Sequence, residues 1–291
     1  AGTGGSAAVG GSGGNGGNGG NGGASGGRAG AGGAGGAGGT PTDDCPNDPQ
    51  KTEPGACGCG VSELCAALET GLAHRYSFSG ANTTATDSIG NAHGTIVGVA
   101  AAAGKVTFNG TDDDYVDLPN GIVSSLSNAS FEVWFTWGGG PVWQRIFDFG
   151  SNSAGEGNRG TGLTYLYITP SEGDAGNALR TSFSLNSNGD GDETTTRASA
   201  PLPTGSVQHI VLVVDDTGNQ LRLYLNATQV GSVAYNGVLS GINDVNVWLG
   251  RSNWNDPPLN GAIDEFRIYD VALSAAQVTA SKDFGPDPAF L

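Results

Sequence analysis

The stretch QHIVLVVDDTGNQLRLYLNATQVG, residues 208–231, decides the fold of this chain. Apolar side chains occupy every second position in two segments of it. They are Ile210, Leu212 and Val214 in the first segment and Leu221, Leu223 and Leu225 in the second. Because successive side chains of a β-strand point to opposite faces, each segment offers one apolar row to a facing sheet. Asn226, Ala227 and Thr228 then predict a tight hairpin turn before the next strand.

The same alternation runs from Arg75 towards the C-terminus, and turn residues interrupt it at short intervals, as is typical of an antiparallel sandwich or barrel. The predicted strands are residues 75–79, 94–97, 105–108, 115–118, 131–137, 145–149, 164–169, 180–185, 208–215, 220–225, 229–235, 245–250 and 262–270. One short helix is predicted near the C-terminus. It begins at Ser274, where Gln277 completes a capping box, and continues toward Lys282.

The 53 glycines of the 291 residues are concentrated at the N-terminus. Residues 1–42 consist almost entirely of Gly, Ala, Ser, Asn and Thr, which cannot bury enough apolar surface to offset the conformational entropy of folding. They predict a flexible stalk or linker. The alternative is that the three-residue runs pack as extended glycine helices with other copies of the chain, so that the protein self-associates. Residues 43–70 are then a Cys-rich segment, and residues 71–291 form one β-domain.

The net charge of −16 and the 12 basic residues argue against nucleic acid and anionic membrane surfaces as partners, because phosphate binding needs clustered Lys and Arg. No apolar run reaches the roughly 20 residues of a transmembrane helix. The chain begins at Ala1 and contains no Met, which favours a processed, exported protein. We therefore expect it to be secreted or tethered to the cell surface.

All four cysteines lie in the segment DDCPNDPQKTEPGACGCGVSELC, residues 43–65. They are Cys45, Cys57, Cys59 and Cys65. An even number of Cys in a short, exported, Pro- and Gly-rich segment favours two disulfides, with three connectivities open. A four-thiolate zinc site is the alternative, although paired C-x-x-C motifs are missing. The segment resembles the CGCG segments that accompany thrombospondin type 3-like calcium repeats in bacterial surface proteins, but it lacks their D-x-D-x-D-G array.

Six segments, in order, resemble the laminin G-like branch of the concanavalin A-like lectin/glucanase superfamily. They are HRYSFSG with DSIGNAHG (residues 74–94), KVTFNGTDDDYVDLP (105–119), SFEVWFTW (130–137), the stretch at 208–231, VNVWLGRS (245–252) and NGAIDEFRIYDVALSAAQV (260–278). The resemblance covers about 210 residues, from Arg75 to about Phe284. It implies an all-β, antiparallel jelly-roll sandwich with one short C-terminal helix. The family usually has Gly where this chain has Ala227 in the hairpin turn.

The resemblance also implies a calcium site, because many laminin G-like domains hold the ion between acidic residues near the two ends of the domain. The matching residues here are Asp87 and Asp264, with Asn91 as a further oxygen ligand. Calcium accepts six to eight oxygen ligands, so a few carboxylates with backbone carbonyls suffice. The alternative is a structural role, in which Asp264 and Glu265 form salt bridges with groups such as Arg267.

Sugar binding on this fold uses aromatic rings beside polar groups, because the C–H face of a sugar stacks on the ring while its hydroxyls need donors and acceptors. Trp254 in the loop SNWNDPPLN is the main candidate. The polar residues around it are Arg251, Asn253, Asn255 and Asp256. Trp134 is a second candidate, because strict alternation points it away from the apolar row of its strand.

No catalytic residues are predicted. A retaining glucanase of this fold needs two nearby carboxylates, as in an E-x-D-x-x-E run, and the sequence has none. An alginate-lyase-like site needs a Gln-x-His, whereas Gln208 and His209 are adjacent. We expect a non-catalytic module that binds glycans or surfaces in adhesion, displayed on the Gly-rich stalk. The alternatives are a structural subunit of an extracellular fibre and a polysaccharide hydrolase or lyase.

Overall fold

The computed structural model describes residues 44–47, 59, 64–174, 176–186 and 192–288. Its contacts divide the chain into two units, Ala1–Thr42 and Asp43–Leu291. The predicted stalk, its proposed self-association and Cys57 all lie outside the described residues. The fold and the site below belong to the second unit.

The first of two antiparallel sheets contains both ends of the domain. Its strand order is β1 (Leu72–Tyr76), β15 (Asn260–Tyr269), β6 (Ala129–Trp137), β11 (Gln208–Asp215), β12 (Gln220–Leu225) and β13 (Thr228–Ala234), and β4 (Val106–Asn109) also pairs with β15. The first and last long strands are therefore neighbours, as the resemblance implies.

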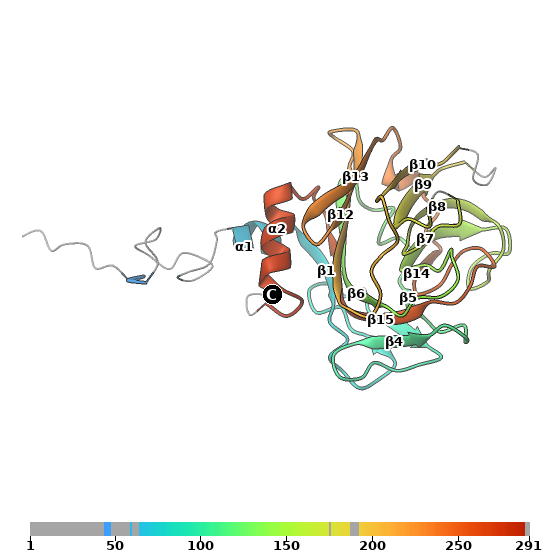
Figure 1. Cartoon of the computed structure of the whole chain (residues 1–291), viewed down its shortest axis with the longest axis horizontal. Coiled ribbons are helices and arrows are strands. Elements are labelled where there is room, and N and C mark those ends of the chain that lie inside the picture. Colours follow the sequence, from blue (N-terminus) through green and yellow to red (C-terminus); the bar gives the residue numbers. More distant parts are fainter. Residues whose placement is uncertain (1–43, 48–58, 60–63, 175, 187–191, 289–291) are drawn as a thin grey trace, which may run out of the picture. The chain divides into compact units, whose positions relative to one another are not determined.

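The second sheet lies against the first (Figure 1). Its order is β10 (Thr194–Arg197), β9 (Arg180–Ser184), β8 (Gly162–Thr169), β7 (Phe147–Asn152), β14 (Asn246–Leu249), β5 (Tyr115–Leu118), β3 (Gly94–Val97) and β2 (Thr84–Ala85). All of its pairings are antiparallel. The two layers confirm the predicted all-β sandwich.

The core between the sheets is built from the alternating apolar rows. Phe131 of β6 packs on Phe147 and Phe149 of β7, with ring centroids 5.7 and 5.5 Å apart. Ile210, Leu212, Val214, Leu221 and Leu223 are all fully buried in the same cluster. Each such side chain contributes roughly 1.5–3 kcal/mol when it leaves water, so the rows account for the pairing of the layers.

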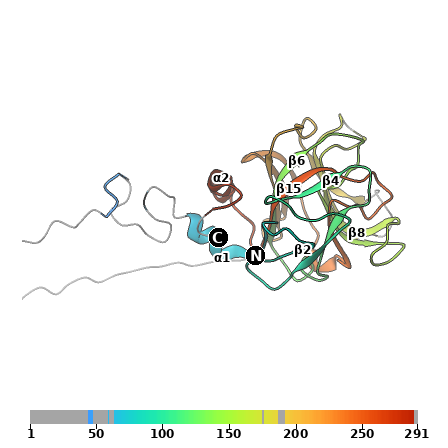
Figure 2. The same ribbon diagram turned by 90° about the horizontal axis from the view of Figure 1, so that it is seen from below.

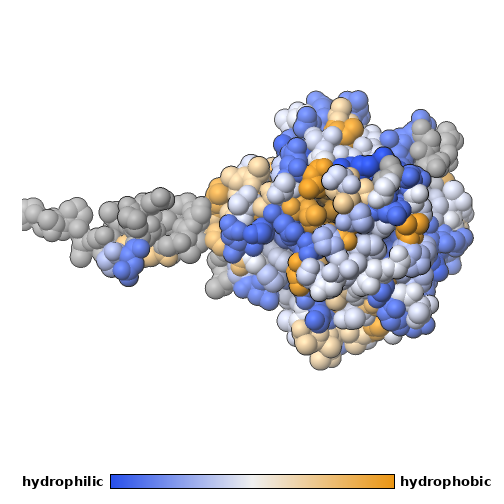
Figure 3. Space-filling view, in the orientation of Figure 1, coloured by the Kyte–Doolittle hydropathy of each residue, from blue (hydrophilic) through white to orange (hydrophobic). Residues whose placement is uncertain are grey.

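Two helices lie on one side of the sandwich in both ribbon views (Figures 1 and 2). They are α1 (Leu64–Gly71) and α2 (Ala275–Phe284). Leu68 of α1 and Val278 of α2 share a buried cluster with Val211 and Tyr224 of the first sheet. Figure 3 shows apolar residues exposed on the surface around these helices. No helix within the described ranges is long and apolar enough to cross a membrane.

The structure confirms the C-terminal helix and adds elements that the sequence did not predict. Ser274 accepts a hydrogen bond from the backbone N–H of Gln277, and the Gln277 side chain accepts one from the Ser274 N–H, completing the capping box. The helix α1 was missed; it begins inside the Cys-rich segment, and the predicted boundary after residue 70 falls within the helix. The short strands β2 and β10 were missed because Thr84–Ala85 and Thr194–Arg197 have no apolar alternation.

The predicted hairpin turn is confirmed, and its type is now clear. Leu225 pairs with Thr228, so Asn226 and Ala227 form a two-residue loop. Both have positive φ, at 50° and 66°, which is the type I′ turn that suits the twist of a hairpin. An Ala in this left-handed region pays a steric cost that Gly avoids.

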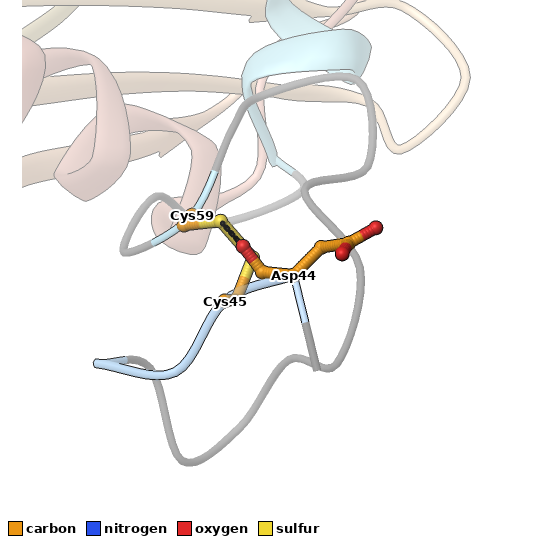
Figure 4. The surroundings of a disulfide bond; sticks show 3 residues. All are labelled: Asp44, Cys45 and Cys59. Atoms are coloured by element: carbon orange, nitrogen blue, oxygen red, sulfur yellow. Dashed lines mark hydrogen bonds between the residues drawn. A yellow bond between two sulfur atoms is a disulfide. The ribbon is translucent and has the colours of Figure 1, made fainter. Parts of the chain in front are cut away.

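The cysteine segment contains a disulfide between Cys45 and Cys59 (Figure 4). The carbonyl oxygen of Asp44 lies 3.3 Å from the Cys59 sulfur; since a disulfide sulfur carries no hydrogen, this is a polar contact and not a hydrogen bond. Cys65, the second residue of α1, is also disulfide-bonded. The zinc alternative is therefore wrong for these three cysteines, because their sulfurs are used in disulfides.

Candidate functional site

The second sheet turns a polar and aromatic face away from the core. Paired residues cross its middle in one row, which runs Ser182, Tyr167, Asp148, Trp248 and Asp117. The loop that follows β14 covers part of this face, because its residues 251–253 are buried. The uncovered part lies toward β8, β9 and β10.

A pocket of about 320 Å³ opens at that uncovered part of the sheet. Its walls come from five separate segments: the β6–β7 connection, the strand β8 with the residue before it, the β8–β9 loop with β9, the residue before β10, and the loop after β14. The lining residues are Trp143, Arg145, Thr161, Tyr167, Asp174, Arg180, Glu193, Trp254 and Asp256. Residues far apart in sequence therefore meet here.

The two tryptophans of the pocket each pack against a glycine. A Cβ added to Gly162 would lie 2.2 Å from the Trp254 ring, and a Cβ added to Gly173 would lie 2.5 Å from Nε1 of Trp143. Trp254 also meets the Tyr165 ring edge-on at 4.5 Å. Both indoles remain partly exposed, so the glycines fix ring positions without covering the rings.

Trp143 has a positive φ of 69°, which is uncommon for a bulky residue and stores strain. Its backbone is held on both sides. The Trp143 N–H donates to the Ser171 carbonyl at 2.8 Å, and its own carbonyl accepts from Nη1 of Arg145 at 2.7 Å. The surrounding structure thus holds this ring at the pocket wall.

Arg145 forms the floor between the two tryptophans. Its guanidinium lies 4.0 Å from the centre of the Tyr167 ring, a cation–π stack. Nη2 forms an ion pair with Asp256 at 2.9 Å, and Nε lies 3.5 Å from Asp148. Arg145 therefore ties the loop carrying Trp254 to the sheet.

Asp148 secures the same loop from below. Its Oδ2 accepts from the backbone N–H of Asn253 and its Oδ1 from the Asn253 side chain, both at 2.9 Å. Burial disfavours the charged form and raises the pKa of Asp148 to about 6, although Arg145 and the Asn253 hydrogen bonds oppose the shift. The loop is thus anchored on a carboxyl group that titrates near neutral pH.

Arg180 holds the opposite wall through all five of its N–H groups. The acceptors are Ser182 for Nε, Glu172 and Asp174 for Nη1, and Glu193 and Thr195 for Nη2. Its guanidinium also lies 5.2 Å from the Trp143 ring. Burial lowers the pKa of Arg180, but Tyr167, Glu193 and Glu172 together outweigh burial and raise it.

Glu193 joins this wall to two tyrosines of β8. Its Oε1 accepts from the Tyr165 hydroxyl at 2.8 Å and from the Tyr167 hydroxyl at 3.4 Å. Burial, and then the charge of Glu193, raise the pKa of Tyr165. Burial raises the pKa of Tyr167 to about 12. Both hydroxyls therefore remain protonated at neutral pH.

Of the predicted ligand-binding residues, Trp254 and Asp256 line the pocket. Arg251 and Asn253 are buried beside it and do not line it. Arg251 lies between the Tyr115 and Trp248 rings, 4.3 Å from each, and pairs with Asp113. Asn253 bonds to Asp148, and Asn255 is exposed on the loop without lining the pocket.

Trp134 does not offer an open ring. It lies on the outer face of the first sheet, as the alternation predicts, but it is only 4% exposed. Its ring packs on His209 at 4.6 Å, and the Arg267 guanidinium lies 4.5 Å from its centre. The second candidate for stacking is therefore corrected: Trp134 is part of a buried cluster in the opposite sheet.

Sequence reasoning missed most of the pocket. The missed residues are Trp143, Arg145, Thr161, Tyr167, Asp174, Arg180 and Glu193. For two of them a signal was present: Tyr167 and Arg180 stand at the outward positions of predicted strands, where an aromatic ring and a charge would meet water or a ligand. Trp143 lies two residues after a run of three glycines and a proline, and nothing in its own segment shows which strand it faces.

The predicted calcium ligands differ in their surroundings. Asp87 is buried and accepts five hydrogen bonds of 2.7–3.1 Å, from the backbone N–H groups of Arg75, Ile89, Gly90 and Ala92 and from Nδ1 of His74. Burial opposes its charge, yet these hydrogen bonds outweigh burial and lower its pKa. A calcium ion at Asp87 would have to displace such donors.

Asp264 lies at a β-bulge in β15. Burial raises its pKa, with Lys105 lowering it and Asp287 raising it further. Asn91 is exposed. Across the described ranges, no three His, Cys, Asp or Glu side chains gather as metal ligands would. The calcium site stays a prediction.

The pocket carboxylates are arranged as salt-bridge partners. Asp256 pairs with Arg145, and both Asp174 and Glu193 pair with Arg180. A glycosidase acid must carry a proton and stand opposite a second, ionised carboxylate. Each of these three carboxylates instead lies against a guanidinium, and no two of them are paired across the pocket as acid and nucleophile would be.

Comparison with known proteins now adds to this geometry. A laminin G family model, described as the concanavalin A-like lectin/glucanases superfamily, matches residues 109–279. Comparison with curated protein sequences gives no match. Solved structures do match: domain 4 of AbnA, a GH43 extracellular arabinanase from Geobacillus stearothermophilus in complex with arabinotriose, is 26% identical, with a TM-score of 0.55 over 72% of this chain and 96% of that one.

A second solved structure shows the same fold at lower identity. It is the Trypanosoma rangeli sialidase in complex with sialic acid, which is 14% identical, with a TM-score of 0.53. The match covers 77% of this chain and 33% of the sialidase, so this chain corresponds to about a third of that enzyme.

Proposed function

The chain belongs to the concanavalin A-like lectin/glucanases superfamily, and from this membership we propose that it binds saccharides, without catalysis, in the pocket between Trp143 and Trp254. The arabinanase domain that it resembles at 26% identity was solved with a bound oligosaccharide, arabinotriose. That likeness supports the class of ligand. The residues of this chain supply the rest of the case.

The observation that carries the proposal is the pair of glycine-seated tryptophans. Indole rings offer a flat apolar surface for the C–H face of a sugar, and the charged groups between them bind its hydroxyls. The pocket volume of about 320 Å³ stands at the lower end of the usual range for small-ligand sites, which suits a short saccharide of one or two units. Glycines beneath the rings reduce the entropy lost on binding, because the rings are already placed.

A glycan array followed by calorimetry with the best glycan tests this proposal. We expect Trp254→Ala and Trp143→Ala each to weaken binding at least tenfold. Gly162→Ala should do the same by displacing the Trp254 ring from its seat. Ile89→Ala is the control, because this exposed side chain lies outside the pocket and its loss should leave affinity unchanged. Retention of no glycan by the wild-type protein would contradict the proposal.

We propose further that the protein works outside the cytoplasm as an adhesion module. The Cys45–Cys59 disulfide supports this, since such bonds persist in oxidising compartments. The Gly-rich residues 1–42 would then display the domain at a distance from its attachment. Deleting residues 1–42 should leave saccharide affinity unchanged and reduce only the adhesion of cells that display the protein.

A further inference from the structure

The polar groups of the pocket that have no protein partner determine which saccharides it can bind. The guanidiniums of Arg145 and Arg180 are not among these groups. Arg180 donates all five of its N–H groups to protein acceptors. The Arg145 side chain is only 4% exposed and stacks its face on Tyr167. Its Nη1 donates to the Trp143 carbonyl and its Nη2 pairs with Asp256, while its buried Nε lies 3.5 Å from Asp148 without a hydrogen bond. A guanidinium fork is a strong partner for a ligand carboxylate or sulfate, and in both arginines Nη1 and Nη2 already contact protein oxygens.

The open groups are instead acceptors. One oxygen of Asp174 binds Arg180, and one oxygen of Asp256 binds Arg145 and Ser252. The second oxygen of each, Oδ1, accepts from none of the residues that the structure describes. The Asp174 side chain is 64% exposed and that of Asp256 is 21% exposed, so both reach solvent. A ligand must offer hydrogen-bond donors to these oxygens.

The charge of the pocket also disfavours anionic ligands. Three carboxylates, those of Asp174, Glu193 and Asp256, line it against the two guanidiniums of Arg145 and Arg180. The whole chain carries a net charge of −16, which repels anions before they arrive. An anionic ligand therefore meets repulsion both at a distance and in contact.

We propose that the pocket selects neutral, hydroxyl-rich saccharides and rejects those that carry a carboxylate or sulfate. This inference rests on the proposed saccharide-binding function and adds the class of ligand. Hydroxyl groups donate to Oδ1 of Asp174 and Asp256 while the sugar ring stacks on Trp254. The carboxylate of a uronate or sialate at the same place would be repelled by these carboxylates, and both pocket arginines are already paired with protein groups.

Matched glycans test the selection directly. Arabinotriose is one neutral probe, and galactose trisaccharides compared with the corresponding galacturonate trisaccharides differ only at C6. Glucan and glucuronan oligomers, and sulfated and unsulfated forms of one glycan, complete the array. We expect neutral members to bind at least tenfold more tightly than acidic partners. Equal or tighter binding of the acidic members overturns the inference and leaves saccharide binding standing; absence of binding to every glycan overturns both.

Variants identify the source of the selection. Asp174→Asn removes an exposed carboxylate from the pocket and should lower the neutral-to-acidic affinity ratio about tenfold. Glu193→Gln also removes a charge and should lower the ratio in the same direction. Asp283→Asn on α2 makes the same change of charge outside the pocket, and the ratio should stay unchanged. A ratio that falls equally in all three variants, or in none, contradicts a selection made by the pocket carboxylates.

Discussion

Arg180 and Arg267 make the same number of hydrogen bonds at opposite faces of the sandwich. Arg180 directs its five N–H groups into the wall of the pocket, where its partner Asp174 is exposed to solvent. Arg267 directs five at Glu265, Glu132, Ser281 and the carbonyls of Gly285 and Pro286, which follow α2. The first network is open and the second is sealed by a helix.

The two networks differ in how far protein groups shield their carboxylates from solvent. Glu132 in the sealed network is fully buried and also accepts from Tyr269 at 2.9 Å and from His209 at 2.7 Å. Both oxygens of Glu132 accept hydrogen bonds from protein donors. The open network leaves carboxylate oxygens facing water. We infer that the sealed network fastens α2 to the first sheet and that the open one is available to a ligand.

The largest expected effect is the loss of the sealed arginine. Arg267→Met should reduce the free energy of unfolding by about 3–5 kcal/mol, because the fully buried Glu132 loses its arginine partner and the buried Glu265 keeps only Arg75. Arg180→Met is the matched variant, and we expect it to cost clearly less. Its partner Glu172 keeps an ion pair with Arg197, and Asp174 is solvated. Glu193 is buried and loses its arginine, but it still accepts hydrogen bonds from the hydroxyls of Tyr165 and Tyr167. Urea unfolding measures both. Equal losses would contradict the contrast between the networks.

Asp148, which anchors the Trp254 loop, and Glu132 of the sealed network should contribute to the pH dependence of stability with opposite sign. Burial raises the pKa of Asp148 to about 6, so its contribution to stability is full below pH 4 and is lost as the pH rises through 6. Burial also opposes the charge of Glu132, but His209 and Arg267 outweigh it and lower its pKa to about 2. Its contribution is full above pH 4.5 and is lost as the pH falls through 2. Each contribution is about 3 kcal/mol.

Unfolding free energies from pH 2 to pH 7 check these signs. Asp148→Asn should remove a decline in stability between pH 4 and 7, and Glu132→Gln should remove a rise between pH 2 and 4.5. Each variant serves as the control for the other. If both variants flattened the same part of the profile, the assignment of opposite signs would be wrong.

Asp87 gives a smaller effect that separates a structural role from a calcium ligand. Asp87→Asn places an N–H₂ group against backbone donors and should cost about 2 kcal/mol of stability. The cost should be the same with a chelator and with millimolar calcium, measured by thermal unfolding. A calcium-dependent rise in the wild-type midpoint that is absent in the variant would instead assign Asp87 to a metal site.

The smallest expected effect concerns the hairpin turn. Ala227→Gly should stabilise the protein by about 0.5–1 kcal/mol, because Gly adopts the positive φ of this position without steric cost. Ala276→Gly on the exposed side of α2 is the control and should destabilise by a similar amount. A loss of stability in both variants would contradict the type I′ turn.

The fold could be predicted because it is encoded locally. The alternating rows around Leu212 and Leu223 fix which faces meet, and the Ser274 capping box fixes the start of α2. The family model agrees with the resemblance read from six motifs. The positions of β2, β10 and α1 were missed because their segments pair or pack through neighbours and carry little pattern of their own.

Of the candidate site, only the loop after β14 could be predicted from the sequence. Trp254 and Asp256 stand in one polar segment, whereas Trp143, Arg145 and Arg180 reach the pocket through strand pairings that single-sequence patterns do not specify. The prediction for Trp134 was wrong for the same reason, because its sequence does not specify which sheet the strand joins. Its outward position was predicted correctly, but the strand lies in the first sheet, where Arg267 and His209 cover the ring.

The most direct test of the central claim follows the five tryptophans during a titration with a neutral oligosaccharide. Their indole N–H signals in an NMR spectrum can be assigned by single Trp→Phe variants. We predict that Trp143 and Trp254 shift in step with saturation, while Trp134, Trp137 and Trp248, which are buried, stay in place. Shifts confined to Trp134, or saturating binding that moves neither Trp143 nor Trp254, would contradict a saccharide site in this pocket.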